Sequence, residues 1–201
     1  MGDYAKAIEY SQQSLTIARE IGNRRDEGIT LINLGIAYYS LGEYAKAIKY
    51  HHQSLAIAQE IRNRQGEAYA LGNLGNAYHV LGDYAKAIEY HQQSLMIAQE
   101  INDRFGEGTA MVNLGETLIT LKHYSEAMAN LQASLDIYRT IGARLGEAIV
   151  LKNLAKVYEK LSNRALAVAY CDHALSIATE LGIPLAKECQ ELKEKLLSQE
   201  A

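Results

Sequence analysis

Apolar and polar residues recur along this chain with the spacing of an α-helix, in blocks that alternate between two patterns. In the first pattern, apolar or small residues lie three and four positions apart, as on one face of a helix. They are Leu31, Leu34, Gly35, Tyr38 and Leu41. The second pattern places a buried side at Ala47, Ile48, Tyr50, His51, Leu55, Ala58 and Ile61. The two patterns predict helices over residues 24–41 and 44–61.

The same pair of patterns returns every 40 residues. The spacing is visible at Tyr4, Tyr44, Tyr84 and Tyr124, and segments 22–61 and 62–101 are identical at most positions. We therefore expect four repeats, each a first helix followed by a second helix. Their predicted bounds are 22–61, 62–101, 102–141 and 142–181.

The residues between the patterns fit helix ends. Gly42 and Gly82 suit a helix terminus with positive φ, and Asp83 suits the N-cap of the next helix. Asn23, Asn63 and Asp103 can cap the first helices. Both loops are short, so neighbouring helices must run antiparallel. A hairpin of this kind cannot bury its own apolar face, and stacked hairpins form an all-α solenoid.

The repeat resembles the tetratricopeptide repeat (TPR). The resemblance is carried by Asn73, Leu74, Gly75, Tyr78, Leu81, Gly82, Asp83, Tyr84 and Ala87. It implies a right-handed α–α superhelix of antiparallel helix pairs. A usual TPR has about 34 residues, and the longer unit of this chain is similar to Pins-type, kinesin-light-chain and bacterial signalling arrays.

The two ends of the array differ. Residues 1–21 have the pattern of a second helix without its first helix, which indicates a fragment of a longer protein, cut on its N-terminal side. If the chain were instead complete, this bare edge would favour self-association. At the other end, Pro184 suits the first turn of a helix, and Leu185, Cys189, Leu192 and Leu196 form one apolar stripe. We expect residues 182–201 to cap the solenoid.

One face of each first helix differs from repeat to repeat, at the positions of Ile29, Ile32, Ile36 and Tyr39 and their equivalents. Packing does not require this variation, and in TPR proteins the corresponding positions line the concave groove that binds a partner. We call these positions, with the asparagines among them, the first-helix face. Its candidate binding residues are Tyr39, Tyr69, Asn76, His79, Glu116, Ile119, Lys152 and Lys156.

Four asparagines on this face do not vary. They are Asn33, Asn73, Asn113 and Asn153. Their amides can bond the backbone of an extended partner, as asparagines at matching sites do in Pins and kinesin light chain, or they can bond between adjacent repeats. A row of lysines has two interpretations as well: it binds a carboxylate of a partner, or it is a solvated charged face. The row consists of Lys152, Lys156 and Lys160.

Composition narrows the function. The 20 Lys and Arg against 24 Asp and Glu give a net charge of −4, which argues against a nucleic-acid partner. No apolar run is long enough to span a membrane. Cys171 and Cys189 form neither a disulfide framework nor a metal pattern and read as buried thiols, which favours a cytoplasmic protein.

Catalytic motifs are missing from the sequence, and no cofactor is implied. His51 and His91 occupy a packed position of the repeat and are expected in the core. Arg24, Arg64, Arg104 and Arg144 begin the first helices, where we expect each to pair with an acidic residue of a neighbouring repeat, such as Glu60 or Glu100. The sequence thus predicts a non-enzymatic adaptor or sensor module that binds a protein or peptide segment in its groove. A self-associating oligomerisation scaffold and a peptide or small-ligand sensor are the alternatives.

Overall fold

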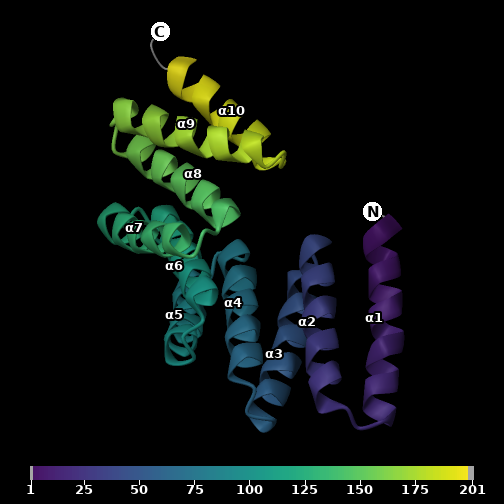
Figure 1. Ribbon diagram of the computed structural model, residues 1–201. Coiled ribbons are helices and arrows are strands. Elements are labelled where there is room, and N and C mark those ends of the chain that lie inside the picture. Colours follow the sequence, from purple (N-terminus) through teal and green to yellow (C-terminus); the bar gives the residue numbers. More distant parts are fainter. Residues whose placement is uncertain (1, 199–201) are drawn as a thin grey trace. The chain divides into compact units, whose positions relative to one another are not determined.

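The computed structural model describes residues 2–198, and within this range the regular structure is entirely α-helical (Figure 1). The helices follow in the order α1 (Gly2–Glu20), α2 (Arg24–Ser40), α3 (Tyr44–Glu60), α4 (Arg64–Val80), α5 (Tyr84–Glu100), α6 (Arg104–Thr120), α7 (Tyr124–Thr140), α8 (Arg144–Lys160), α9 (Arg164–Glu180) and α10 (Leu185–Ser198). The predicted helices at 24–41 and 44–61 are confirmed to within a residue.

The helix ends form as the sequence predicts. Gly42 and Gly82 have φ of 78° and 80°, and the N–H of Gly42 donates to the carbonyl of Tyr39 at 2.9 Å. At the N-termini, Asn63 Oδ1 accepts from the N–H of Gly66 at 3.0 Å, and Asp83 caps α5 in the same way. Non-glycine residues with positive φ also end helices, at Arg62, Asn102, Lys122 and Ser162.

The helices pack as successive hairpins in two compact units, Met1–Asp103 and Arg104–Ala201. In the first unit α2 packs with α3 and α4 with α5, and α1 lies against α2. In the second unit α6 packs with α7 and α8 with α9, and α10 lies against α9. The first helices of successive repeats also touch within a unit, because α2 contacts α4 and α8 contacts both α6 and α10.

The core of the first unit lies between the two helices of each hairpin. Leu31 and Leu34 of α2 are buried there with Ile57 of α3. Leu41 and Ile61 were expected on the buried side, and this expectation is wrong because both are exposed. Each is the C-cap residue of its helix, where the chain turns away from the packed length of the hairpin.

Two histidines are core residues, as predicted. The rings of His51 and His91 are almost wholly buried against Gly35 and Gly75 of the facing first helices. Burial lowers the pKa of each imidazole to about 4, with smaller contributions from His52 and His79.

The helix α10 lies within the described part of the predicted range 182–201, and its role as a cap stays a prediction. Its apolar stripe is buried at Leu185, Cys189 and Leu196, and half-buried at Leu192. The thiol of Cys171 donates to the carbonyl of Cys189 at 3.1 Å, and both thiols are free. Among the helices of residues 2–198, none combines the length and the apolar character needed to cross a membrane.

Candidate functional site

The first-helix face of the first unit exposes large apolar side chains. Ile29 of α2 is 47% exposed, and Tyr69, its equivalent on α4, is 51% exposed. Ile36, two turns further along α2, is exposed to a similar degree, and Asn33 between them is exposed. Large apolar side chains in contact with water are unfavourable, and binding of another molecule would remove this contact. This part of the first-helix face is therefore accessible from solvent.

Aromatic contacts position the end of this face. The ring of Tyr39 makes an edge contact with Tyr44, with the ring centroids 5.3 Å apart. His79 makes the equivalent contact with Tyr84 at 5.5 Å. Tyr39 and His79 are half-buried, so each ring keeps one accessible side while its neighbour restrains its orientation. The same kind of edge contact occurs in both repeats, although the residue on the first helix differs.

The first-helix face of the second unit is closed by internal polar contacts. Lys152 Nζ donates to Glu188 Oε2 on α10 at 2.7 Å, and its side chain is only 13% exposed. Asn153 Nδ2 donates to Glu116 Oε1 on α6 at 2.8 Å. These contacts join α8 to α6 and to α10 across the face.

Lys156 lies beside these contacts. Burial lowers the pKa of its ammonium group, and the nearby charge of Lys152 lowers it further, against the opposing effect of Glu116 and Glu188. The hydrogen bond from Lys152 lowers the pKa of Glu188. The lysine row is therefore neither the solvated face nor the open carboxylate site that the sequence suggested, except at Lys160, which is exposed.

The four repeated asparagines are not equivalent in the structure. Asn33 is exposed, and Asn73 and Asn113 are half-buried. Asn73 Nδ2 donates to the carbonyl of Tyr69 in its own helix at 2.9 Å. Asn153 is buried, bonds the adjacent repeat, and leaves its Oδ1 without a partner. Bonding between adjacent repeats, one of the two interpretations, therefore holds for Asn153.

The remaining candidates fall on both units. Asn76 and Ile119 are half-buried at the centre and the end of their helices, and Glu116 is exposed but engaged by Asn153. Ile29 and Ile36 lie at positions that the sequence assigned to this varied face without naming them as binding residues, and both are exposed.

Arginines at the start of the first helices form ion pairs with the end of the second helix. Arg24 bonds Glu60 and Glu27, and Arg64 bonds Glu100 and Glu67. The predicted partners Glu60 and Glu100 are confirmed, but their placement in a neighbouring repeat is wrong, because both members of each pair belong to one repeat. Each pair joins the N-terminus of a first helix to the C-terminus of the second helix in the same hairpin.

Two buried carboxylates of the first helices, Glu27 and Glu147, receive an arginine from the preceding repeat. Arg19 Nε lies 2.8 Å from Oε1 of Glu27, which is buried. Burial alone would raise the pKa of Glu27, but the hydrogen bonds from Arg19 and Arg24 outweigh it and the pKa is lowered. The arginines therefore hold repeats together.

The tetratricopeptide repeat family matches residues 1–60 and 66–140, and a second tetratricopeptide repeat pattern matches residues 151–180. The chain belongs to the TPR family. Members of this family are in general scaffolds without enzymatic activity. A search of curated protein sequences gave no match.

Solved structures share the fold at low sequence identity. A putative kinesin light chain from Podosopora anserina, with nearly identical TPR-like repeats, has a TM-score of 0.70 and 17% identity, over 90% of this chain and 89% of that one. A Rap protein complexed with competence and sporulation factor has a TM-score of 0.79 and 15% identity, over 87% and 49%.

A signal transduction ATPase with numerous domains (STAND) and a TPR sensor, from Pyrococcus horikoshii, has a TM-score of 0.78 and 20% identity. The match covers 97% of this chain and 30% of that protein. This chain therefore spans about half of the Rap protein and less than a third of the STAND protein. The kinesin-light-chain likeness inferred from the repeat length is confirmed at the level of the fold.

Proposed function

We propose that this chain is a protein-interaction module, and that the first-helix face of its first unit binds a segment of a partner protein. The observation that carries this proposal is the exposure of Ile29, Ile36 and Tyr69 on α2 and α4. The equivalent face of the second unit carries charged side chains, and contacts within the unit engage them, from Lys152 to α10 and from Asn153 to α6. The partner segment is accordingly one with apolar side chains, and not a strongly acidic one.

The energetics require both apolar contacts and hydrogen bonds. A Kd near 1 μM corresponds to about 8 kcal/mol. Covering the exposed parts of Ile29, Ile36 and Tyr69 contributes about 1 kcal/mol each, and each hydrogen bond from an asparagine amide contributes about 1 kcal/mol. Together, the three apolar contacts and one hydrogen bond each from Asn33 and Asn73 contribute about 5 kcal/mol. Contacts with other side chains of the face, such as Tyr39 and His79, have to contribute the rest.

The solved relatives support the role of an adaptor or sensor. One is a Rap protein in complex with a factor, and another carries a TPR sensor within a signal transduction ATPase. We assign this chain the same kind of role, as the non-enzymatic recognition part of a signalling protein. The free thiols of Cys171 and Cys189 fit a reducing, cytoplasmic setting.

The test is a comparison of two charged variants as baits in extracts of the source cell. Ile29→Arg with Tyr69→Arg places charges on the first-helix face. Met96→Arg places one on the exposed side of α5, at a residue that is 68% exposed. We expect the first variant to lose proteins that the unaltered chain and the Met96→Arg variant both retain. Equal retention by all three baits, at equal stability in urea, would refute the proposal.

A further inference from the structure

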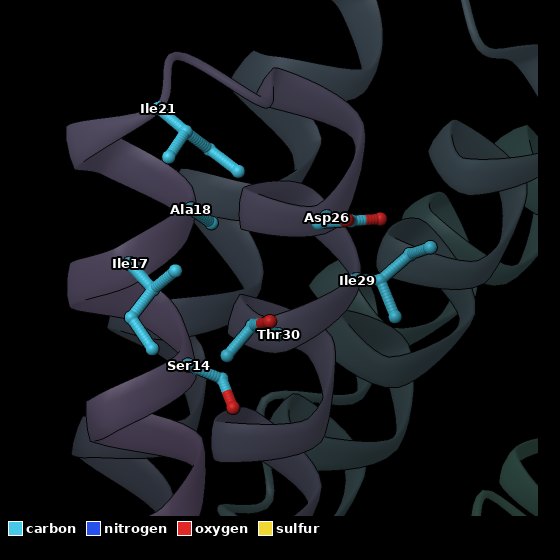
Figure 2. A pocket seen from close by; sticks show the side chains of 7 residues that line it. All are labelled: Ser14, Ile17, Ala18, Ile21, Asp26, Ile29 and Thr30. Atoms are coloured by element: carbon cyan, nitrogen blue, oxygen red, sulfur yellow. The ribbon is translucent and has the colours of Figure 1, made fainter.

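A small hollow lies in the first unit between the helices α2 and α3 and the start of α4. Ile57 and Ala58 of α3 line it and are buried, whereas Arg25 and Ile29 of α2 line it and are exposed. Figure 2 shows the side chain of Ile29 directed away from α1. The enclosed volume is about 20 Å³, room for about one water molecule or for the edge of a ring. The hollow is therefore small and apolar, and it opens beside an exposed residue of the first-helix face.

Two glycines form part of the wall of this hollow. Gly28 lies on α2, and Gly66 lies in the first turn of α4. The same two positions in the next three repeats hold the pairs Ala68 and Gly106, Gly108 and Gly146, and Ala148 and Ala186. A pair of glycines thus occurs once in each compact unit, at Gly28 with Gly66 and at Gly108 with Gly146.

The second unit places an aromatic ring between its glycine pair. Tyr138 of α7 stands at the position of Ala58, and it is buried. A Cβ atom added at Gly108 would lie 2.9 Å from one edge of the Tyr138 ring, and a Cβ atom added at Gly146 would lie 2.7 Å from the other edge. Phe105 of α6 contacts the same ring, with the centroids 5.7 Å apart. The glycine pair therefore leaves the width that a ring needs.

The first unit has the glycine pair without the ring. Ala58 supplies a single methyl group where α7 supplies a phenol, and the hollow lies beside this methyl group. Arg25 stands at the position of Phe105. A guanidinium group also stacks on the face of an aromatic ring. In the described part of the chain, no hydrogen bond or ion pair occupies the guanidinium of Arg25.

We propose that this hollow is the anchor pocket of the first-helix face, and that it takes an aromatic side chain such as phenylalanine from the partner segment. This inference rests on the proposed function, because it names the side chain by which the bound segment is held. The ring enters past Ile29, with its edge against Ala58 and its face against the guanidinium of Arg25. It occupies the place that Tyr138 fills from inside the chain in the second unit.

The probe for the anchor pocket is N-acetylphenylalaninamide, which carries the side chain and the backbone of one phenylalanine. Spectra of the full chain with methyl-labelled isoleucine follow the titration, since an aromatic ring shifts the resonances of the methyl groups that it contacts. We expect saturable shifts for Ile29 and Ile57, which line the hollow. Ile137, the equivalent of Ile57 beside Tyr138, should not shift. N-acetylleucinamide should bind about two- to fivefold more weakly, because it has no ring face for Arg25.

Three variants test the residues of the anchor pocket. Ala58→Tyr closes the pocket from inside, as Tyr138 does in the second unit, and should abolish the isoleucine shifts. Met96→Tyr adds the same ring on the exposed side of α5 and should leave the shifts unchanged. Arg25→Gln should weaken the binding of N-acetylphenylalaninamide by about two- to fivefold. If Ala58→Tyr does not fold, Arg25→Gln and the comparison of isoleucines within the unaltered chain decide the question.

The bait comparison distinguishes a failure of the anchor pocket from a failure of the proposed function. The pocket is overturned if Ile29 and Ile57 show no saturable shifts, if the shifts persist in folded Ala58→Tyr, or if the leucine derivative binds as tightly. It is also overturned if folded Ala58→Tyr, used as bait, retains a protein that Ile29→Arg with Tyr69→Arg loses, and the proposed function then stands. Equal retention by every bait refutes the proposed function instead, whatever the titration shows.

Discussion

The imidazole of His91 packs directly on the backbone of Gly75, so closely that a Cβ atom added at residue 75 would lie 2.5 Å from Nδ1 of the ring. Gly35 and His51 repeat this relationship one repeat earlier, and Gly115 meets Leu131 in the second unit. Glycine at this position lets the two helices of a hairpin approach each other, and a large side chain from the second helix fills the space.

The first prediction concerns two glycines of α4. Gly75→Ala should lower the free energy of unfolding by about 1–3 kcal/mol, because the buried ring of His91 cannot move away from the new methyl group. Gly72→Ala should raise it by up to about 1 kcal/mol, since alanine favours the helix and its Cβ would meet only Ser94 Oγ, at 3.5 Å. Urea unfolding of both variants measures the difference. Changes of the same sign would contradict the packing described for Gly75.

A second prediction follows from the lowered pKa of His91. An unfolded histidine has a pKa near 6.5, whereas that of His91 in the fold is about 4. The unfolded chain therefore binds the proton more tightly. Stability from the neutral ring is complete above about pH 6.5 and falls as the pH drops towards 4, by about 1.4 kcal/mol per pH unit between those limits. His51 adds a similar effect.

The variant that tests this is His91→Leu, since Leu131 already fills the equivalent position against Gly115. The loss of stability between pH 7 and pH 5 in urea unfolding should be smaller for this variant than for the unaltered chain. The pH range avoids Glu27, whose lowered pKa makes its contribution disappear only below about 4.5. His123→Gln changes an exposed histidine and is the control. An unchanged pH response in His91→Leu would exclude the histidine explanation.

A third prediction separates two members of the asparagine row. Asn33→Ala should raise the free energy of unfolding by up to about 0.7 kcal/mol, because an exposed mid-helix asparagine is replaced by a better helix former. Asn153→Ala should lower it by about 1–3 kcal/mol, because the hydrogen bond to the Glu116 carboxylate is lost and a buried space is left. Calorimetry of the two variants gives the sign of each change in the free energy of unfolding. A stabilising effect at both positions would mean that the contact to Glu116 carries no free energy.

Local structure was accessible from the sequence because each 40-residue unit carries its own signals. The caps at Asn63 and Asp83, the positive φ of Gly42 and the burial of His91 all depend on residues near one another in the repeat. The same signals occur in each repeat, so each one could be checked against the others. The helix bounds and the resemblance to the TPR family were both predicted from this repeated pattern.

The exposure of individual side chains could not be predicted from the repeated pattern. Ile17 and Ile57 are the same residue in the same pattern, and only the presence of α2 beside Ile57 makes one buried and the other bare. The pairing of Lys152 with Glu188 could not be predicted either, because it joins α8 to α10, and the sequence does not state the register between these two helices. The sequence therefore grouped the candidate binding residues on one face of the first helices. The structure was needed to show which of them are exposed and which are engaged in contacts within the chain.

Photo-crosslinking at Tyr69 is the most direct test of partner binding on the first-helix face. The residue is replaced by benzoylphenylalanine in the source cell, and the same replacement at Met96 serves as the comparison, since both side chains are exposed on helices of one unit. We expect a discrete crosslinked protein from position 69 that is missing from position 96 and disappears when Ile29→Arg is added. Identical crosslinks from both positions, or a product from position 96 alone, would contradict it.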